Sequence, residues 1–368
     1  MRDEIKPTRS IPCTDGFRLV SCAVIIERMT TTSGRIDHSA KDRRPCSRVY
    51  LATEAQDDRK RMGINIFSWF KSQREDIPSD GPYELHHKNG QLRCKAVNKD
   101  SQRDGPYESY YEDGQLESEG SFKDGREDGL WESHFETGQL KFNGNFKEGN
   151  LDGRQEWFHK NGQLRERQPY RDGKKNGLWE FFYENGQSKS TGNYIDGRRD
   201  GSFEVFYIDG QPRSKGTHKD DRRDGLYESY YENGQLEANG TFKNGRKHGH
   251  WESYHDNGQL EQRGTYENDL ANGLLEWFHE NGQLRSEGNY RDNKRDGPFE
   301  EYRENGQTKV KENYKYGKQD GPYESYDEDG RLNTKGTFKD GVLDGPFEIY
   351  EDNGQLKEKG VYKAGVLQ

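Results

Sequence analysis

The feature that most constrains this chain is a repeat of 24 residues that runs without insertion or deletion from Asp80 to the C-terminus. The copy at residues 224–247 reads DGLYESYYENGQLEANGTFKNGRK. A fixed period of this length is typical of repeat architectures, in which each unit buries surface only against its neighbours. The chain therefore divides into a leader, residues 1–79, and an array, residues 80–368, whose twelve copies begin at residues 80, 104, 128, 152, 176, 200, 224, 248, 272, 296, 320 and 344.

Each repeat is expected to form a β-hairpin. In the copy at Asp224, the aromatic-rich run 227–231 has the composition of a short strand. Asn233-Gly234 follows it, and Asn-Gly between two such runs predicts a two-residue type I′ turn, with a positive φ at both residues. Residues 235–243 return as the second strand, and residues 244–247 form a wider turn into the next copy. Twelve such hairpins predict an all-β fold, an elongated single-layer antiparallel β-meander.

A two-residue turn at Asn233-Gly234 also fixes the register of the hairpin. It pairs Glu232 with Gln235, Tyr231 with Leu236, Ser229 with Ala238, and Tyr227 with Gly240. One face then carries Tyr227, Tyr231, Leu236, Gly240 and Phe242, and the other carries Glu228, Tyr230, Glu237, Asn239 and Thr241. The ring of Tyr227 is expected to lie across the bare backbone of Gly240, an arrangement called aromatic rescue.

Substitutions at the Tyr227 position support a strand. The position is aromatic in ten of the twelve copies, and the exceptions are Gln155 and Leu275. In those two copies a tryptophan stands two residues later, at Trp157 and Trp277. A shift of two residues keeps a ring on the same face of a strand, whereas on a helix it would move the ring far round the axis.

A column of glutamates occupies the opposite face. The Glu228 position is glutamate in all twelve copies, about 10 Å apart from one hairpin to the next. The column could be a functional acidic ladder, or it could stabilise the sheet through cross-strand ion pairs worth about 0.2–1 kcal/mol each. The predicted cross-strand neighbour is acidic in Glu108–Glu119 and Glu276–Glu287, but it is basic in seven copies: Lys95, Arg167, Lys215, Arg263, Lys311, Lys335 and Lys359.

Composition and charge restrict the class of partner. Hydrophobic residues make up 27% and charged residues 34%, which alone would suggest disorder, but the 12% of aromatic residues, the 44 glycines and the strict period argue for a thin folded sheet. Residues 1–79 hold 15 Lys and Arg against 11 Asp and Glu, which leaves 43 against 56 in the array, a net charge of −13. An acidic array disfavours direct binding of nucleic-acid phosphate and favours basic partners.

The leader differs from the array. Residues 1–61 have no periodicity and are expected to be a disordered tail, unless the natural start is Met62. Residues 64–70 are the dense apolar patch before the repeats, and a cover for the sheet edge is favoured over an interfacial membrane anchor. The four cysteines, Cys13, Cys22, Cys46 and Cys94, form no disulfide framework, and no secretory signal or membrane span is evident. The expected location is therefore the cytoplasm.

No catalytic or cofactor motif is present, neither a Walker loop, a dinucleotide fingerprint, a nucleophile elbow nor a zinc cluster, so no enzyme activity and no cofactor are expected. The Asp-Gly segments lack the spaced carboxylates of a calcium loop and are attributed to turns. His248, His250 and His255 are the one concentration of histidines. A packed role is favoured over a metal site, because the position of His255 is also histidine at His159 and His279.

A second aromatic column lies on the glutamate face. Either the sheet curls and buries this column, or the column is a binding stripe, since regularly spaced exposed rings are typical of interfaces. Under the second interpretation, Phe206, Tyr230 and Tyr254 are the central partner-binding anchors, with Glu204, Glu228 and Glu252 as rim charges. The full column is Tyr110, Phe158, Phe182, Phe206, Tyr230, Tyr254, Phe278, Tyr302, Tyr326 and Tyr350.

The pattern Gly-x-Tyr-Glu-x-Tyr-Tyr-x-Asn-Gly-Gln-Leu…Gly-x-Phe-Lys-x-Gly, as in residues 225–245, resembles the bacterial variant of the MORN repeat and is most similar to the YwqK family. The resemblance covers residues 80–368. The YwqK family is described as antitoxins of toxin–antitoxin systems, so the resemblance implies a non-catalytic protein-binding module that neutralises a toxin. Eukaryotic MORN arrays are associated with membranes, which gives the alternative of a membrane-associated scaffold. The sequence leaves the partner and the oligomeric state open.

Overall fold

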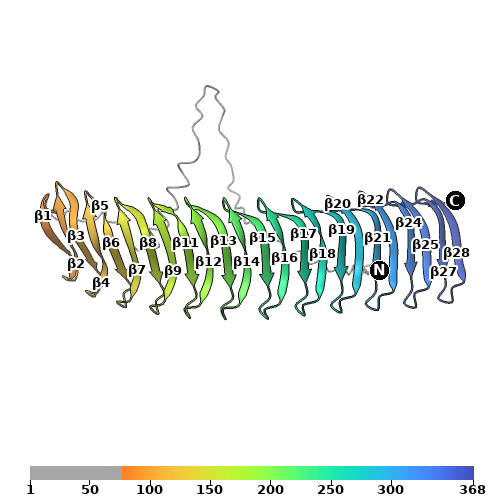
Figure 1. The fold of residues 1–368 in the computed structure, drawn as a ribbon, viewed down its shortest axis with the longest axis horizontal. Coiled ribbons are helices and arrows are strands. Elements are labelled where there is room, and N and C mark those ends of the chain that lie inside the picture. The colour runs from red at the N-terminus through yellow and green to blue at the C-terminus, as the bar shows by residue number, and fades with distance from the viewer. Residues whose placement is uncertain (1–76) are drawn as a thin grey trace, which may run out of the picture. The chain divides into compact units, whose positions relative to one another are not determined.

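The computed structural model describes residues 77–368, and every regular secondary-structure element in this range is a β-strand. They form one antiparallel sheet that does not close on itself, in which each strand pairs with its neighbours along the chain (Figure 1). The expected single-layer meander of hairpins is thereby confirmed for the array. The predictions for residues 1–61, Met62 and residues 64–70 lie outside the described residues. Within residues 77–368, no helix could cross a membrane.

Each repeat contributes an outgoing strand and a return strand. The outgoing strands are β1 (Gly81–His86), β3 (Gln102–Tyr110), β5 and β6 (Arg126–Glu127 and Gly129–His134), β8 (Asn150–Phe158), β10 and β11 (Lys174–Lys175 and Gly177–Phe182), β13 (Arg198–Phe206), β15 (Arg222–Tyr230), β17 (Arg246–Tyr254), β19 (Leu270–Phe278), β21 (Lys294–Tyr302), β23 and β24 (Lys318–Gln319 and Gly321–Tyr326), β26 and β27 (Val342–Leu343 and Gly345–Tyr350), and β29 (Val366–Leu367). The return strands are β2 (Leu92–Lys99), β4 (Leu116–Lys123), β7 (Leu140–Lys147), β9 (Leu164–Arg171), β12 (Ser188–Ile195), β14 (Pro212–Lys219), β16 (Leu236–Lys243), β18 (Leu260–Glu267), β20 (Leu284–Arg291), β22 (Thr308–Lys315), β25 (Leu332–Lys339) and β28 (Leu356–Lys363).

The two turns of each repeat are the reverse of the sequence prediction. The tight turn is Asn244-Gly245, where Lys243 pairs with Arg246 and the φ angles are 52° and 84°. Positive φ at both residues is the signature of a type I′ turn. The turn at Asn233-Gly234 is wider, because Tyr231 N–H donates to Gln235 O at 2.9 Å, and only Gly234 has a positive φ, 83°. This geometry is that of a three-residue loop that ends in a bulge.

The side chain of Asn233 explains the wider turn. Its Oδ1 accepts the N–H of Gln235 at 3.0 Å, and its Nδ2 donates to the carbonyl of Asp256 in the next repeat at 2.7 Å. Both turns of this copy contain Asn-Gly, so the dipeptide alone could not distinguish them. The asparagine of the wider turn serves the contact between successive repeats.

The wider turn changes the register at one end of the hairpin only. The pairs Tyr227–Gly240 and Ser229–Ala238 are confirmed. The pairs Tyr231–Leu236 and Glu232–Gln235 are wrong, because a bulge after Ser229 makes Tyr230 the partner of Leu236 and Tyr231 closes the loop with Gln235.

The glycine in the second position of every repeat bends the outgoing strand. Gly225 has a φ of 108° and lies within β15, and the equivalent glycine has a positive φ in all twelve copies. The aspartate before it does not form a turn of its own: the Oδ2 of Asp224 accepts the N–H of Asn244 at 2.9 Å and so caps the tight turn. The attribution to turns is therefore wrong for these pairs at the start of each repeat, which shape the strand. It is correct for pairs such as Asp124-Gly125, which forms a tight turn with φ angles of 48° and 76°.

The face that carries the Tyr227 column, the ring face, contains the core. Trp131 is 1% exposed and Phe142 is 0% exposed, and they pack with Phe122, Phe146, Leu151, Trp157 and Tyr170. Trp157 is 2% exposed, as expected for a ring that replaces Gln155 on the same face. Cations cover the rings, for example Arg295 at 3.5 Å from the ring centroid of Phe299.

Aromatic rescue of Gly240 occurs, but with a different ring from the predicted one. Gly240 pairs with Tyr227 on one side and with Trp251 of the next repeat on the other. A Cβ added to Gly240 would lie 2.3 Å from Cδ2 of Trp251, so the tryptophan covers the glycine. Successive repeats are therefore joined by ring packing as well as by backbone hydrogen bonds.

A second link between repeats runs along the wide turns. Tyr231 donates its hydroxyl to Tyr254 O at 2.7 Å, His255 donates Nε2–H to Phe278 O at 3.1 Å, and Arg303 donates to Tyr326 O at 2.8 Å. The packed interpretation of His255 is thereby confirmed. In the described residues, no group of three or more His, Cys, Asp or Glu side chains is placed to hold a metal ion.

Candidate functional site

The face opposite the rings, the open face, carries three parallel rows of side chains. Within one outgoing strand the rows come from Leu226, Glu228 and Tyr230, which alternate with residues of the ring face. Across the hairpin, Leu226 pairs with Thr241 and Glu228 with Asn239. We name the rows the leucine row, the glutamate row and the second aromatic row after these residues.

The second aromatic row is neither buried nor freely exposed. Phe206, Tyr230 and Tyr254 are all half-buried, so neither alternative for this column holds in full. The hydroxyl of Tyr254 donates to Oε2 of Glu252 at 2.7 Å, and that of Tyr230 donates to Glu228. The predicted anchors and rim charges thus lie on one face in three consecutive repeats, but each tyrosine is coupled to the glutamate two residues before it.

The coupling shifts the ionisation of both partners. Partial burial, together with the hydrogen bond to Glu252, raises the pKa of Tyr254 to about 12. The same hydrogen bond lowers the pKa of Glu252 below its ordinary value, and His250 acts in the same direction. Glu252 is therefore charged at neutral pH.

Lys215 lies between two of the predicted rim glutamates. Its backbone pairs with Glu204 on one side and with Glu228 on the other. The ammonium lies 2.9 Å from Glu228 and 5.6 Å from the centroid of the Tyr230 ring. The sequence predicted an ion pair between Lys215 and Glu204. The backbone pairing of these two residues is correct, but the ammonium contacts Glu228 of the following repeat.

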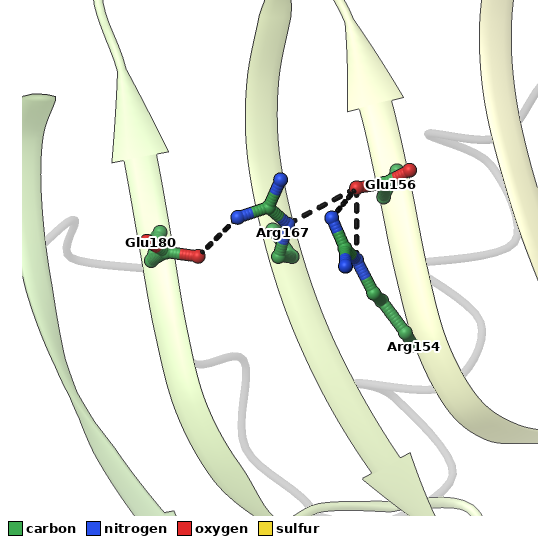
Figure 2. Close-up of polar contacts among 4 residues, drawn as sticks. All are labelled: Arg154, Glu156, Arg167 and Glu180. Atoms are coloured by element: carbon green, nitrogen blue, oxygen red, sulfur yellow. Dashed lines mark hydrogen bonds and ion pairs between the residues drawn. The ribbon is translucent and has the colours of Figure 1, made fainter. Parts of the chain in front are cut away.

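Two arginines neutralise one stretch of the glutamate row (Figure 2). Arg167 bridges Glu156, at 3.0 Å from Nε, and Glu180, at 2.6 Å from Nη1. Arg154 occupies the leucine-row position of its repeat and also contacts Glu156, at 2.5 Å. Although partial burial acts in the opposite direction, these arginines lower the pKa of Glu156. In this stretch, the glutamate row therefore stabilises the sheet through cross-strand ion pairs, the second of the two interpretations of the column.

In two other stretches of the glutamate row, glutamates lie next to one another on neighbouring strands. Glu119 lies between Glu108 and Glu132 in the strand register, and Glu287 lies between Glu276 and Glu300. The first of these runs borders a recess of about 980 Å³ between repeats. The recess is lined by Asp104, Pro106, Glu108, Glu119, Asp124, Asp128, Leu130 and Glu132, together with Lys99, Gly105, Tyr107, Gly120, Ser121, Phe122, Lys123 and Gly129. Carboxylates therefore outnumber cations around it.

Sequence reasoning missed the leucine row. Leu130, Leu178, Leu226 and Leu274 are 56%, 51%, 73% and 46% exposed. They recur every second repeat, and this spacing is a signal that the sequence already contained. The row offers apolar contact area beside the glutamates, which the half-buried aromatic row offers only in part.

Comparison with known proteins gives a family match over ten of the twelve repeats. The matched family is described as MORN repeat variant, and the matched residues are 103–124, 127–148, 151–172, 175–196, 223–244, 247–268, 271–292, 295–316, 319–340 and 343–364. These segments together make up more than half of the chain. No curated protein matches it.

Solved structures that match include TcdB2-TccC3 and TcdB2-TccC3-Cdc42, each 11% identical to this chain. The matches cover 77% and 78% of this chain and 19% and 20% of those chains, with TM-scores of 0.17 and 0.14. This chain therefore spans about a fifth of the length of those structures. With TM-scores this low, the likeness carries no argument about fold or function.

Proposed function

This chain belongs to the MORN repeat variant family, and from that premise we propose that its array is a non-catalytic protein-binding module that neutralises a cationic toxin or a similar basic effector. The observation that carries the proposal is the acidic character of the array, with its row of glutamates on the open face. Glutamate stands in all twelve copies of one row, and the array has a net charge of −13, from 43 basic and 56 acidic residues. Such a surface complements a basic protein.

Electrostatics and shape both support this function. Opposite charge steers a basic partner onto an acidic surface and raises the association rate. Toxins that attack nucleic acid are commonly basic, because they must bind phosphate. A rigid row of side chains repeated at about 10 Å could cover the substrate groove of such a toxin. Phe206, Tyr230 and Tyr254 are the proposed anchors, and the rim charges are Glu204, Glu228 and Glu252.

The finer assignment rests on the sequence pattern of residues 225–245. Its similarity to the YwqK family supports the role of an antitoxin in the bacterial cytoplasm. The test begins with affinity purification of the full chain from its native cell. A basic protein that co-purifies is then expressed alone and together with the chain. We expect growth arrest when it is expressed alone and normal growth on co-expression. A co-purifying protein that is harmless when expressed alone would contradict the antitoxin role.

Replacing Phe206, Tyr230 and Tyr254 together by Ala is expected to weaken binding of that partner about 30-fold or more, since ring anchors at interfaces are worth about 2 kcal/mol or more. The measurement is the dissociation constant of a variant whose unfolding transition is retained. The matched control replaces Ile195 and Ile208, which are 54% and 64% exposed outside the three rows, by Ala. An unchanged dissociation constant in the triple variant would remove the rings from the binding surface.

A further inference from the structure

The leucine row holds a leucine in every second repeat from Leu130 to Leu274, and each leucine is followed two residues later by a glutamate. The residue two positions earlier is an aspartate before Leu130 and Leu226 and an asparagine before the other two leucines. Leu130 is preceded two residues earlier by Asp128 and followed two residues later by Glu132. All three side chains line the recess of about 980 Å³, together with Pro106 and its own flanking acids. The same order of acid, apolar residue and glutamate recurs at Leu226, which is 73% exposed, between Asp224 and Glu228.

The dimensions of the row limit what can bind along it. Successive repeats are two strands apart, about 10 Å, and residues two apart on a strand are separated by about 7 Å. Between residues 130 and 274 a ligand that follows the row therefore meets a leucine about every 20 Å, with the glutamate row about 7 Å to one side. On the other side, at the same distance, it meets Asp128 beside Leu130 and Asp224 beside Leu226. In copies without leucine the row carries Arg154, Ser202 or His250 between the leucines, and the charge of Arg154 is taken up by Glu156 at 2.5 Å. In the outer copies it carries proline, at Pro82, Pro106, Pro298, Pro322 and Pro346.

We propose that the leucine row, with the glutamate row on one side and Asp128 and Asp224 on the other, forms the docking surface for a basic amphipathic helix of the partner protein, which lies along the array. This inference rests on the proposed function and specifies the partner segment. A chain along the row runs across the strands, so it cannot pair with them as an added strand, and an extended segment would leave its backbone groups unpaired. A helix satisfies its own backbone groups.

The match between helix and row is quantitative. Two heptads of α-helix, 14 residues, advance about 21 Å, close to the advance of the two repeats that separate successive leucines, and a helix is about 10–12 Å wide with its side chains. A stripe of apolar residues at heptad spacing would face the leucines. Lys and Arg on both flanks of the stripe would reach the glutamate row on one side and Asp128 and Asp224 on the other.

The same four leucines could instead contact lipid. The glutamate row beside the leucines opposes that use, since the cytoplasmic surface of a membrane is itself negative and attracts basic segments. The experiment therefore includes a separate measurement of binding to lipid vesicles.

The experiment measures binding of labelled peptides to the full chain by fluorescence anisotropy at low salt. One peptide is a helix of about 28 residues, about 42 Å long, with leucines at heptad spacing flanked by lysines. A second peptide has the same composition in shuffled order. In the test variant, Leu130, Leu178, Leu226 and Leu274 are replaced by Ser, the residue that stands in the row at Ser202. In the control variant, Ile195 and Ile208 are replaced by Ser, and circular dichroism checks that both variants fold.

We expect the amphipathic peptide to bind at least about tenfold more tightly than the shuffled one, and the leucine variant, but not the control, to lose that preference. Equal binding of the two peptides, or an unaltered preference in the leucine variant, would overturn the helix inference while leaving a basic partner in place. Failure of both basic peptides to bind would remove the electrostatic basis of the proposed function as well. Sedimentation of the chain with neutral phosphatidylcholine vesicles, abolished in the leucine variant, would overturn the inference in favour of lipid.

Discussion

Replacing Trp131 by Ala is expected to destabilise the array by about 3–5 kcal/mol, the usual cost of truncating a fully buried tryptophan. Trp131 is 1% exposed and lies 5.1 Å from the ring of Phe122 and 6.2 Å from that of Phe146. Its Nε1 donates to Ser121 O at 3.1 Å. Because each repeat contacts only its neighbours, we expect the loss to concentrate in the adjoining repeats.

The measurement is urea unfolding combined with hydrogen exchange resolved by repeat, since a long array need not unfold in one step. The matched control is Leu226→Ala, where the side chain is 73% exposed, and its effect should stay within about 0.5 kcal/mol. An effect of Trp131→Ala no larger than that of the control would contradict a core on the ring face.

Replacing Gly240 by Ala is expected to cost about 1–3 kcal/mol through overpacking. The backbone φ at Gly240 is compatible with alanine, but the new Cβ would lie 2.3 Å from Cδ2 of Trp251. The indole has little freedom to move, because its Nε1 donates to Thr241 O at 3.0 Å.

A double-mutant cycle separates this clash from a general intolerance of alanine. In a Trp251→Ala background, which removes the whole indole, the added cost of Gly240→Ala should fall to about 0.5 kcal/mol or less, since the two residues are in contact and their effects are coupled. The same cost in both backgrounds would show that Trp251 does not cover the glycine.

The period and the strand alternation predicted most of the fold. The pair Tyr227–Gly240 and the face shift from Gln155 to Trp157 both follow from side-chain alternation, which a strand imposes strictly. The turns could not be predicted in the same way. Asn-Gly occurs at residues 233–234 and at 244–245, and what separates the two is a hydrogen bond from Asn233 to Asp256 in another repeat.

Contacts between repeats account for the other differences. In a meander of near-identical hairpins, each strand has two neighbours with almost the same residues, so a pattern cannot say which neighbour a side chain prefers. Gly240 is covered by Trp251 of the next copy, and Lys215 binds Glu228 of the next copy. The sequence pattern, read one hairpin at a time, assigned both contacts within a single copy.

The shared face of the glutamates and rings in the candidate site was predicted correctly, but the contacts of the rings and the row of leucines were not. Glu204, Glu228 and Glu252 do lie on one face with the second aromatic row, yet Tyr230 and Tyr254 donate hydrogen bonds to their own glutamates and are half-buried. The leucine row was overlooked because Arg154, Ser202 and His250 alternate with the leucines, which hides the apolar position when every copy is weighed equally.

The measurement that tests the central claim most directly is the salt dependence of the association rate between the full chain and its co-purifying basic partner. From about 0.01 M to about 1 M salt the screening length falls from about 30 Å to about 3 Å. If the carboxylates of the open face steer the partner, the rate constant should fall by about tenfold or more over this range, and replacing Glu204, Glu228 and Glu252 by Gln should flatten the dependence. A rate constant that stays the same across the range would contradict an acidic docking surface for a basic protein.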